Sequence, residues 1–76
     1  MEKLVEYVAK ALVEDPTSVV VEVIHDSPEE QALALRVAPE DRGRVIGKNG
    51  RTAHAFRTLL SAAAPEGRLV TLEIVD

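Results

Sequence analysis

The stretch that decides the fold is residues 42–51, which run Arg42-Gly43-Arg44-Val45-Ile46-Gly47-Lys48-Asn49-Gly50-Arg51. Two glycines, Gly47 and Gly50, bracket two polar residues between segments with helical spacing of apolar side chains. Glycine adopts positive φ and has no Cβ, so another backbone can come close to the main chain. The N-terminus of the helix that follows directs unpaired N–H groups toward this loop. These features predict a tight loop between two helices that favours an anion.

The charge of the chain is segregated around this loop. Residues 42–57 contain five basic residues and no acid, a local charge of +5, whereas the other sixty residues carry −9. The net charge of −4 therefore hides one basic segment on an acidic body. A polyanion responds to the local potential within a Debye length of about 8–10 Å rather than to the total charge. We expect the basic segment to form a binding site.

The N-terminal half predicts one helix and a hairpin. A helix is expected over residues 2–14, ended by Asp15 because the next residue is Pro16. Its apolar face is expected to comprise Leu4, Val5, Val8, Ala11 and Leu12. Runs of β-branched and alternating residues predict strands over 18–25 and 31–37. The short turn between them makes this pair antiparallel.

The C-terminal half predicts two helices and a strand. A short helix is expected from Pro39 to about Ile46, a second over 51–63, and a strand over 68–75. The second helix is expected to turn Ala55, Phe56, Leu59, Leu60 and Ala63 inward. The order α-β-β-α-α-β gives an α+β fold, with a three-stranded mixed sheet and all three helices on one face. All 76 residues are expected to form one domain.

The opposite face of this sheet is less polar than a monomer needs. Its apolar residues are expected to be Val20, Ile24, Ala32, Ala34 and Leu69. We interpret this face as a surface for a second copy or another partner.

Several classes of chemistry have no support in the sequence. The chain has no cysteine, and neither His25 nor His54 has a carboxylate at ligand spacing, so no metal site is expected. The adjacent acids at 29–30 and 40–41 are assigned to solubility and helix capping. No nucleophile has a base nearby in the sequence, so we expect no catalysis and no cofactor. Without a signal peptide or an apolar run of about 18 residues, the expected location is the cytoplasm.

The loop and its context resemble a known RNA-binding module. Residues 45–51, Val-Ile-Gly-Lys-Asn-Gly-Arg, are similar to the I-G-x-x-G signature of the KH domain, whose loop clamps about four backbone nucleotides. The order of elements resembles the type II, prokaryotic form over essentially the whole chain. At this length the chain resembles the small stand-alone bacterial proteins of the KhpA family.

This resemblance implies single-stranded RNA in a groove beside the loop, lined by the flanking helices and the last strand. The candidate RNA-binding residues are Arg44, Ile46, Gly47, Lys48, Asn49, Gly50, Arg51 and His54. The only aromatic residues, Tyr7 and Phe56, are expected in the core, so bases would rest on aliphatic surface. Changing Gly47 to Asp is expected to abolish RNA binding and leave the fold intact.

The resemblance further implies an RNA chaperone or post-transcriptional regulator that forms a homodimer or pairs with another KH-containing protein. Two alternatives stay open. In one, the sheet face recruits a protein partner and RNA binding is incidental. In the other, the helix–loop–helix grips the phosphates of duplex DNA without recognising its sequence. No membrane partner is expected.

Overall fold

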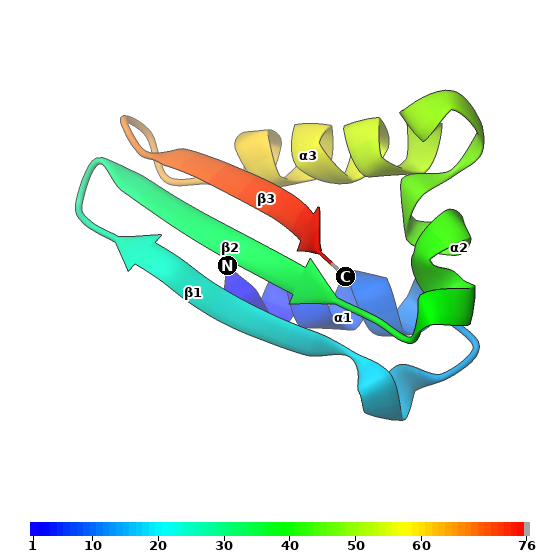
Figure 1. Cartoon of the computed structure of the whole chain (residues 1–76). Helices are drawn as coiled ribbons and strands as arrows, with labels where there is room; N and C mark the ends of the chain where they lie inside the picture. The colour runs from blue at the N-terminus through cyan, green and yellow to red at the C-terminus, as the bar shows by residue number, and fades with distance from the viewer. Residues whose placement is uncertain (76) are drawn as a thin grey trace.

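The computed structural model describes residues 1–75. Its helices and strands are α1 (Glu2–Leu12), β1 (Val20–Asp26), β2 (Glu30–Arg36), α2 (Arg42–Ile46), α3 (Arg51–Ala63) and β3 (Leu69–Val75). Three single turns of 3-10 helix lie between them: η1 (Pro16–Ser18), η2 (Pro39–Asp41) and η3 (Lys48–Gly50). The expected order α-β-β-α-α-β is confirmed (Figure 1).

The three strands form one mixed sheet in the order β1-β2-β3. β1 pairs antiparallel with β2, and β3 pairs parallel with β2, so that Leu33 of β2 lies between Val23 and Leu72. The α2–α3 segment makes the long crossover that a parallel pair requires. α1 and α3 cover one face of the sheet, and α2 closes one end of that layer (Figure 1). The predicted mixed sheet with its helices on one face is confirmed.

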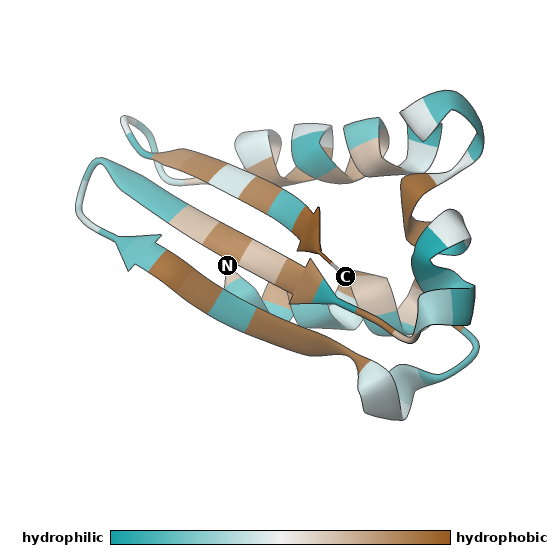
Figure 2. Ribbon diagram, in the orientation of Figure 1, coloured by the Kyte–Doolittle hydropathy of each residue, from teal (hydrophilic) through white to brown (hydrophobic). Residues whose placement is uncertain are grey.

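The core lies between the sheet and the helices. Its largest fully buried side chains are Leu33, Leu35, Leu60, Val5 and Val45. Each stabilises the fold by roughly 1.5–3 kcal/mol relative to an exposed position. Figure 2 shows hydrophobic residues concentrated along the strands and hydrophilic residues in the turn between α2 and α3.

The first helix buries a narrower stripe than its sequence suggests. Val5 and Ala9 are fully buried, one helical turn apart, whereas Ala11 is exposed. The expectation that Tyr7 lies in the core is wrong, because its side chain is 74% exposed. Tyr7 is two residues from Val5, about 200° around the helix, so the two side chains point in nearly opposite directions.

The long helix α3 also buries a narrower stripe of side chains than its sequence suggests. Ala53, Phe56 and Leu60 are buried at i, i+3 and i+7 spacing. The predicted inward positions Ala55, Leu59 and Ala63 are instead exposed, with Leu59 at 43%. A 76-residue chain has too few elements to cover a wide apolar face, so only the stripe against the sheet is closed off.

The segment between α1 and β1 also differs from its prediction. α1 ends at Leu12 and β1 begins at Val20, two residues inside each predicted boundary. Between them, the hydroxyl groups of Thr17 and Ser18 donate hydrogen bonds to the Asp15 carboxylate. These bonds lower the pKa of Asp15 below its ordinary value of 3.8. A proline and two hydroxyl residues thus form a closed turn where the sequence pattern suggested a longer strand.

The outer face of the sheet is partly apolar, as expected. Val20, Ile24 and Leu69 are 46%, 59% and 56% exposed, but Ala34 is only 7% exposed and adds little surface. Ile24 is the extra residue of a β-bulge, because Val23 pairs with Leu33 and His25 with Ala32. Among the described residues, none of the helices is both long enough and apolar enough to cross a membrane.

Candidate nucleic-acid interface

The loop Gly47–Gly50 has the backbone that its glycines predict. Gly47 has φ 76° and ψ 170°, a conformation that is essentially restricted to glycine. Asn49 and Gly50 both lie in the left-handed region, with φ 58° and 75°. The Gly47 N–H donates to Gly43 O at 2.8 Å and ends α2, and the Gly50 N–H donates to Gly47 O at 3.1 Å. These four residues therefore join α2 to α3, and the space where Gly50 would carry a Cβ is open.

The two glycines have different roles in the loop. A Cβ on Gly47 would lie 2.2 Å from Thr52 Oγ1 and 2.7 Å from Thr52 N, whereas a Cβ on Gly50 would meet nothing within 4 Å. Gly47 is thus packed against the first turn of α3, and Gly50 faces open space. The expectation that Gly47→Asp would leave the fold intact is therefore wrong, because any side chain there collides with Thr52.

The N-terminus of α3 is open and faces this loop. Gly50 is its N-cap residue, and within residues 1–75 no side chain caps the helix. The first N–H groups of a helix have no acceptor inside it, and the helix dipole makes that end positive. Lys48 and Arg51 are exposed on either side, and neither has an ion pair or hydrogen bond with another described residue. Donors and cations therefore converge where an oxyanion could sit.

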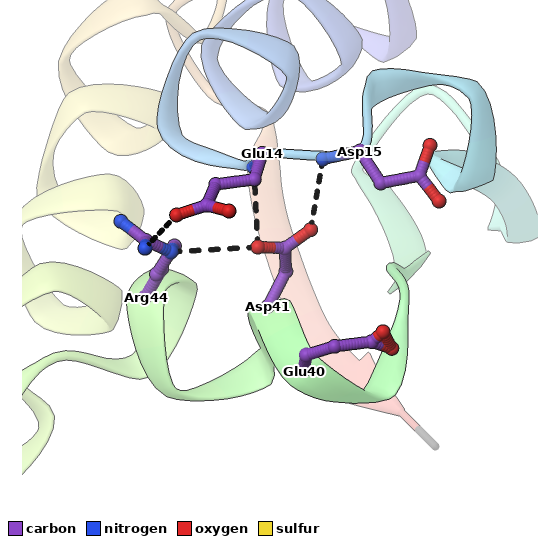
Figure 3. Close-up of a pocket in the computed structure, with 5 residues that line it drawn as sticks. All are labelled: Glu14, Asp15, Glu40, Asp41 and Arg44. Atoms are coloured by element: carbon purple, nitrogen blue, oxygen red, sulfur yellow. Dashed lines mark hydrogen bonds and ion pairs between the residues drawn. The ribbon is translucent and has the colours of Figure 1, made fainter.

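Arg44, unlike Lys48 and Arg51, forms ion pairs within the protein. Its guanidinium forms an ion pair and a hydrogen bond with Glu14, and its Nε lies 3.5 Å from Asp41 Oδ1 (Figure 3). Glu14 follows α1 and lies 30 positions from Arg44 in the sequence, whereas Asp41 is three residues before Arg44 and its side chain contacts the same segment after α1. The charge that the sequence assigns to the loop at this position is therefore largely balanced within the protein.

Asp41 connects the segments of this network, a structural role that the sequence did not predict. It is 97% buried, since its exposed fraction is 3%, and its two oxygens accept the N–H groups of Glu14 and Asp15 at 3.1 Å each. The expected capping of its own helix is wrong, because Asp41 makes no side-chain cap bond there. These bonds join residues 26 and 27 positions apart, so no local pattern in the sequence could reveal them.

Two hollows lie near the candidate site without containing the loop. The first, of about 350 Å³, is lined by Glu14, Asp15, Glu40, Asp41 and Arg44 (Figure 3). The second, of about 190 Å³, lies between α1 and α3 and is lined by Val8, Leu12, Thr52, Ala55, Phe56 and Leu59. Neither is the expected groove between the loop and the last strand. No group of three or more metal-ligating side chains occurs within residues 1–75.

The remaining candidate residues occupy the two helices beside the loop. Ile46, the last residue of α2, is half-buried, whereas its neighbour Val45 is fully buried and belongs to the core. His54 is exposed on the first turn of α3, where its carbonyl accepts the Thr58 hydroxyl at 3.0 Å. Aliphatic, imidazole and cationic groups thus surround the loop, and no exposed aromatic ring projects from α2 or α3.

Comparison with known proteins assigns the family. A family model described as "KhpA/KhpB, KH domain" matches residues 2–74. A protein named RNA-binding protein KhpA from Caldanaerobacter subterraneus subsp. tengcongensis is 50% identical over 76 residues, covering 99% of this chain and 100% of its own. The proteins of that name from Treponema pallidum and Halalkalibacterium halodurans are 51% and 47% identical, covering 99% and 100% of this chain and 94% and 100% of their own. No solved structure matches. The chain therefore belongs to the KhpA/KhpB family of KH-domain proteins.

Proposed function

We propose that this protein binds single-stranded RNA through the loop Gly47–Gly50 and the surfaces of α2 and α3 beside it. The observation that carries the proposal is the N-terminus of α3, which no side chain of residues 1–75 caps and which opens onto a glycine loop flanked by two cations without ion pairs in that part of the chain. Full-length relatives named RNA-binding proteins support the choice of RNA. The proposed contact residues are Ile46, Gly47, Lys48, Asn49, Gly50, Arg51 and His54, and Arg44 joins them only if it leaves its ion pair with Glu14.

The proposed contact residues form two groups, one that binds the backbone of the RNA and one that contacts its bases. The absence of a Cβ at Gly50 lets a phosphate approach the free N–H groups at the start of α3. Lys48 and Arg51 add charge, and the Asn49 side chain can donate or accept a hydrogen bond. Ile46 offers an aliphatic surface to a base. Stacking on aromatic rings contributes about 1–3 kcal/mol per base where it occurs, so its absence here predicts modest affinity.

The test is a fluorescence polarisation titration of the full chain with a labelled single-stranded RNA and with duplex DNA of equal length. We expect tighter binding to the RNA. Two engaged cations give a slope of about −1.4 for log K against log salt, and Lys48→Gln lowers its magnitude by about 0.7. Tighter binding to the duplex would favour the DNA alternative, and no binding to either would refute the proposal.

Gly50→Asp is the variant of choice, because the left-handed region accepts aspartate at a low cost. It places a carboxylate where we expect the phosphate, and we predict loss of RNA binding. Gly67→Asp is its matched control, because Gly67 also has positive φ, at 80°, and open space around its Cα. Gly67 lies beyond the other end of α3, about 20 Å along the helix axis. Equal losses from both variants would contradict the assignment of the loop.

The proposal extends to the cellular role and the partner of this protein. We propose that residues 1–76 form one KH domain that acts in the cytoplasm as an RNA chaperone or post-transcriptional regulator. Pairing with itself or with another KH-containing protein would raise the effective concentration of a weak site. The exposed Val20 and Ile24 of β1 and Leu69 of β3 support a partner on the outer sheet face. Sedimentation of the wild type and of Ile24→Glu tests this, and an unchanged monomer in both would count against it.

A further inference from the structure

Arg57 on α3 makes a contact that RNA binding through the loop does not by itself require. Its Nε–H donates a hydrogen bond of 3.1 Å to the backbone carbonyl of Leu72 in β3. Among the described residues this is its one recorded polar contact, and the residue remains exposed. The guanidinium is thus held in one place by one of its five N–H donors.

The carbonyl that Arg57 contacts belongs to the free edge of the sheet. β3 is a terminal strand and pairs only with β2. The Leu69 N–H donates to Glu29 O, so the backbone groups of Leu69 point toward β2. Alternate residues of a strand direct their backbone groups to opposite edges, and Leu72 is three residues further on. Its carbonyl therefore points away from β2, where the Arg57 side chain of α3 contacts it.

The flank of α3 that carries Arg57 begins at the glycine loop. Gly50, His54 and Arg57 follow at i, i+4 and i+7 and so lie on one side of the helix. The opposite flank, which includes Ala55 and Leu59, faces α1. Arg57 is about 10 Å from Gly50 along the helix axis. A single-stranded RNA whose backbone is bound at the loop would therefore place a base near the guanidinium of Arg57.

We propose that Arg57 is a base-recognition residue, which selects a base with two neighbouring acceptors. With the Nε–H bound to Leu72 O, the two terminal nitrogens keep four N–H donors, and one N–H from each nitrogen points the same way to form a parallel pair. Guanine (O6 and N7) and cytosine (O2 and N3) present two adjacent acceptors, whereas adenine and uracil alternate acceptors with donors. This inference rests on the proposed RNA binding and names which bases that site prefers.

The experiment measures binding of the full chain to a single-stranded oligouridine that carries one guanosine, cytidine or adenosine at each position in turn. We expect guanosine or cytidine at one position to bind about five- to 150-fold more tightly than adenosine or uridine. If guanosine is preferred, 7-deazaguanosine, which lacks N7, removes the preference. If cytidine is preferred, 3-deazacytidine, which lacks N3, does so. These analogues test the wild-type protein without any substitution.

The protein side of the test is Arg57→Lys, which keeps the positive charge and loses the paired donors. We expect the base preference to disappear while the slope of log K against log salt is unchanged. Arg36→Lys is the control and should keep the preference, because Arg36 is exposed on β2 and has no polar side-chain partner among residues 1–75.

Two outcomes would overturn the inference. One is equal binding of all four bases by the wild type, and the other is an undiminished preference in Arg57→Lys. If that variant with an undiminished preference also self-associates, the arginine instead shields the free edge of β3. If the wild type binds none of these RNAs, the proposed function itself fails, and the inference fails with it.

Discussion

Replacing Gly47 and Gly50 one at a time by alanine tests the distinct roles of the two loop glycines. Both have positive φ, 76° and 75°, so alanine is disfavoured at each. Their surroundings differ, because a Cβ on Gly47 would overlap Thr52 Oγ1 and Thr52 N, whereas one on Gly50 would enter solvent. The same substitution is therefore expected to have unequal costs at positions three residues apart.

The size of the difference follows from these contacts. A left-handed alanine costs roughly 1–2 kcal/mol, which is the whole effect expected at Gly50. At Gly47 the glycine-only region costs about 1–3 kcal/mol and the overlap adds about 1–3 kcal/mol. The overlap involves a backbone nitrogen, which cannot rotate away as a side chain could. A domain of this length has a total stability of about 4–11 kcal/mol, so Gly47→Ala removes a large part of it.

Urea denaturation followed by circular dichroism measures both costs. With a slope of about 1 kcal/mol per molar urea for so small a chain, Gly47→Ala should lower the midpoint by at least about 2 M and Gly50→Ala by about 1–2 M. The slope itself should stay constant, which shows that the unfolded states are comparable. A midpoint for Gly47→Ala equal to or above that of Gly50→Ala would refute the packing of Gly47 on Thr52.

Three further experiments, with four substitutions between them, probe the rest of the fold. In the same assay, Leu60→Ala should lower the free energy of unfolding by about 2–5 kcal/mol, because Leu60 is fully buried. Leu59→Ala should lower it by about 1 kcal/mol or less, because Leu59 is 43% exposed. Similar losses from both substitutions would contradict the orientation of α3. Asp41→Ala should lower the free energy of unfolding by about 2–5 kcal/mol, because it leaves two part-buried N–H groups without their acceptor. A loss smaller than that of Leu59→Ala would show that water accepts these hydrogen bonds in place of the carboxylate. The pKa of Asp15 is lowered in the folded state, so its stabilising contribution is present above pH 3.8 and is lost as the pH falls through the lowered value. The difference in urea midpoint between wild type and Asp15→Asn should therefore vanish in acid, and a difference that persists there would contradict this cause.

The order of elements and the loop were predictable because short-range patterns encode them. The bounds of α3, 51–63, agree with the prediction, since glycines precede the helix and a proline follows it. The left-handed conformations of Asn49 and Gly50 likewise follow from residue type. Alternation along 31–37 predicted which side chains of β2 face the helices, and the pairing of Leu33 with Leu72 agrees with it.

The features that escaped prediction depend on contacts between distant segments. The apolar positions of α1 and α3 span a wider arc than the sheet covers, so the sequence alone did not separate Leu59 from Leu60 or exclude Tyr7 from the core. The bulge at Ile24 depends on the pairing of β1 with β2 rather than on residue type. The ion pair of Arg44 with Glu14 joins residues 30 positions apart.

These long-range contacts also change what the basic segment can do. The sequence places five cations within residues 42–57, but Glu14 and Asp41 balance Arg44, and Leu72 holds the Nε–H of Arg57. Of the remaining cations, Lys48 and Arg51 lie in and directly after the loop and have no ion pair with another residue of 1–75, so the proposed phosphate contacts number two and correspond to a salt slope of about −1.4. If Arg44 left Glu14 for a phosphate, the slope would approach about −2.1. If the loop binds RNA as proposed, so shallow a dependence leaves little non-specific attraction, and we expect discrimination among RNAs to come from hydrogen bonds to the bases beside α3.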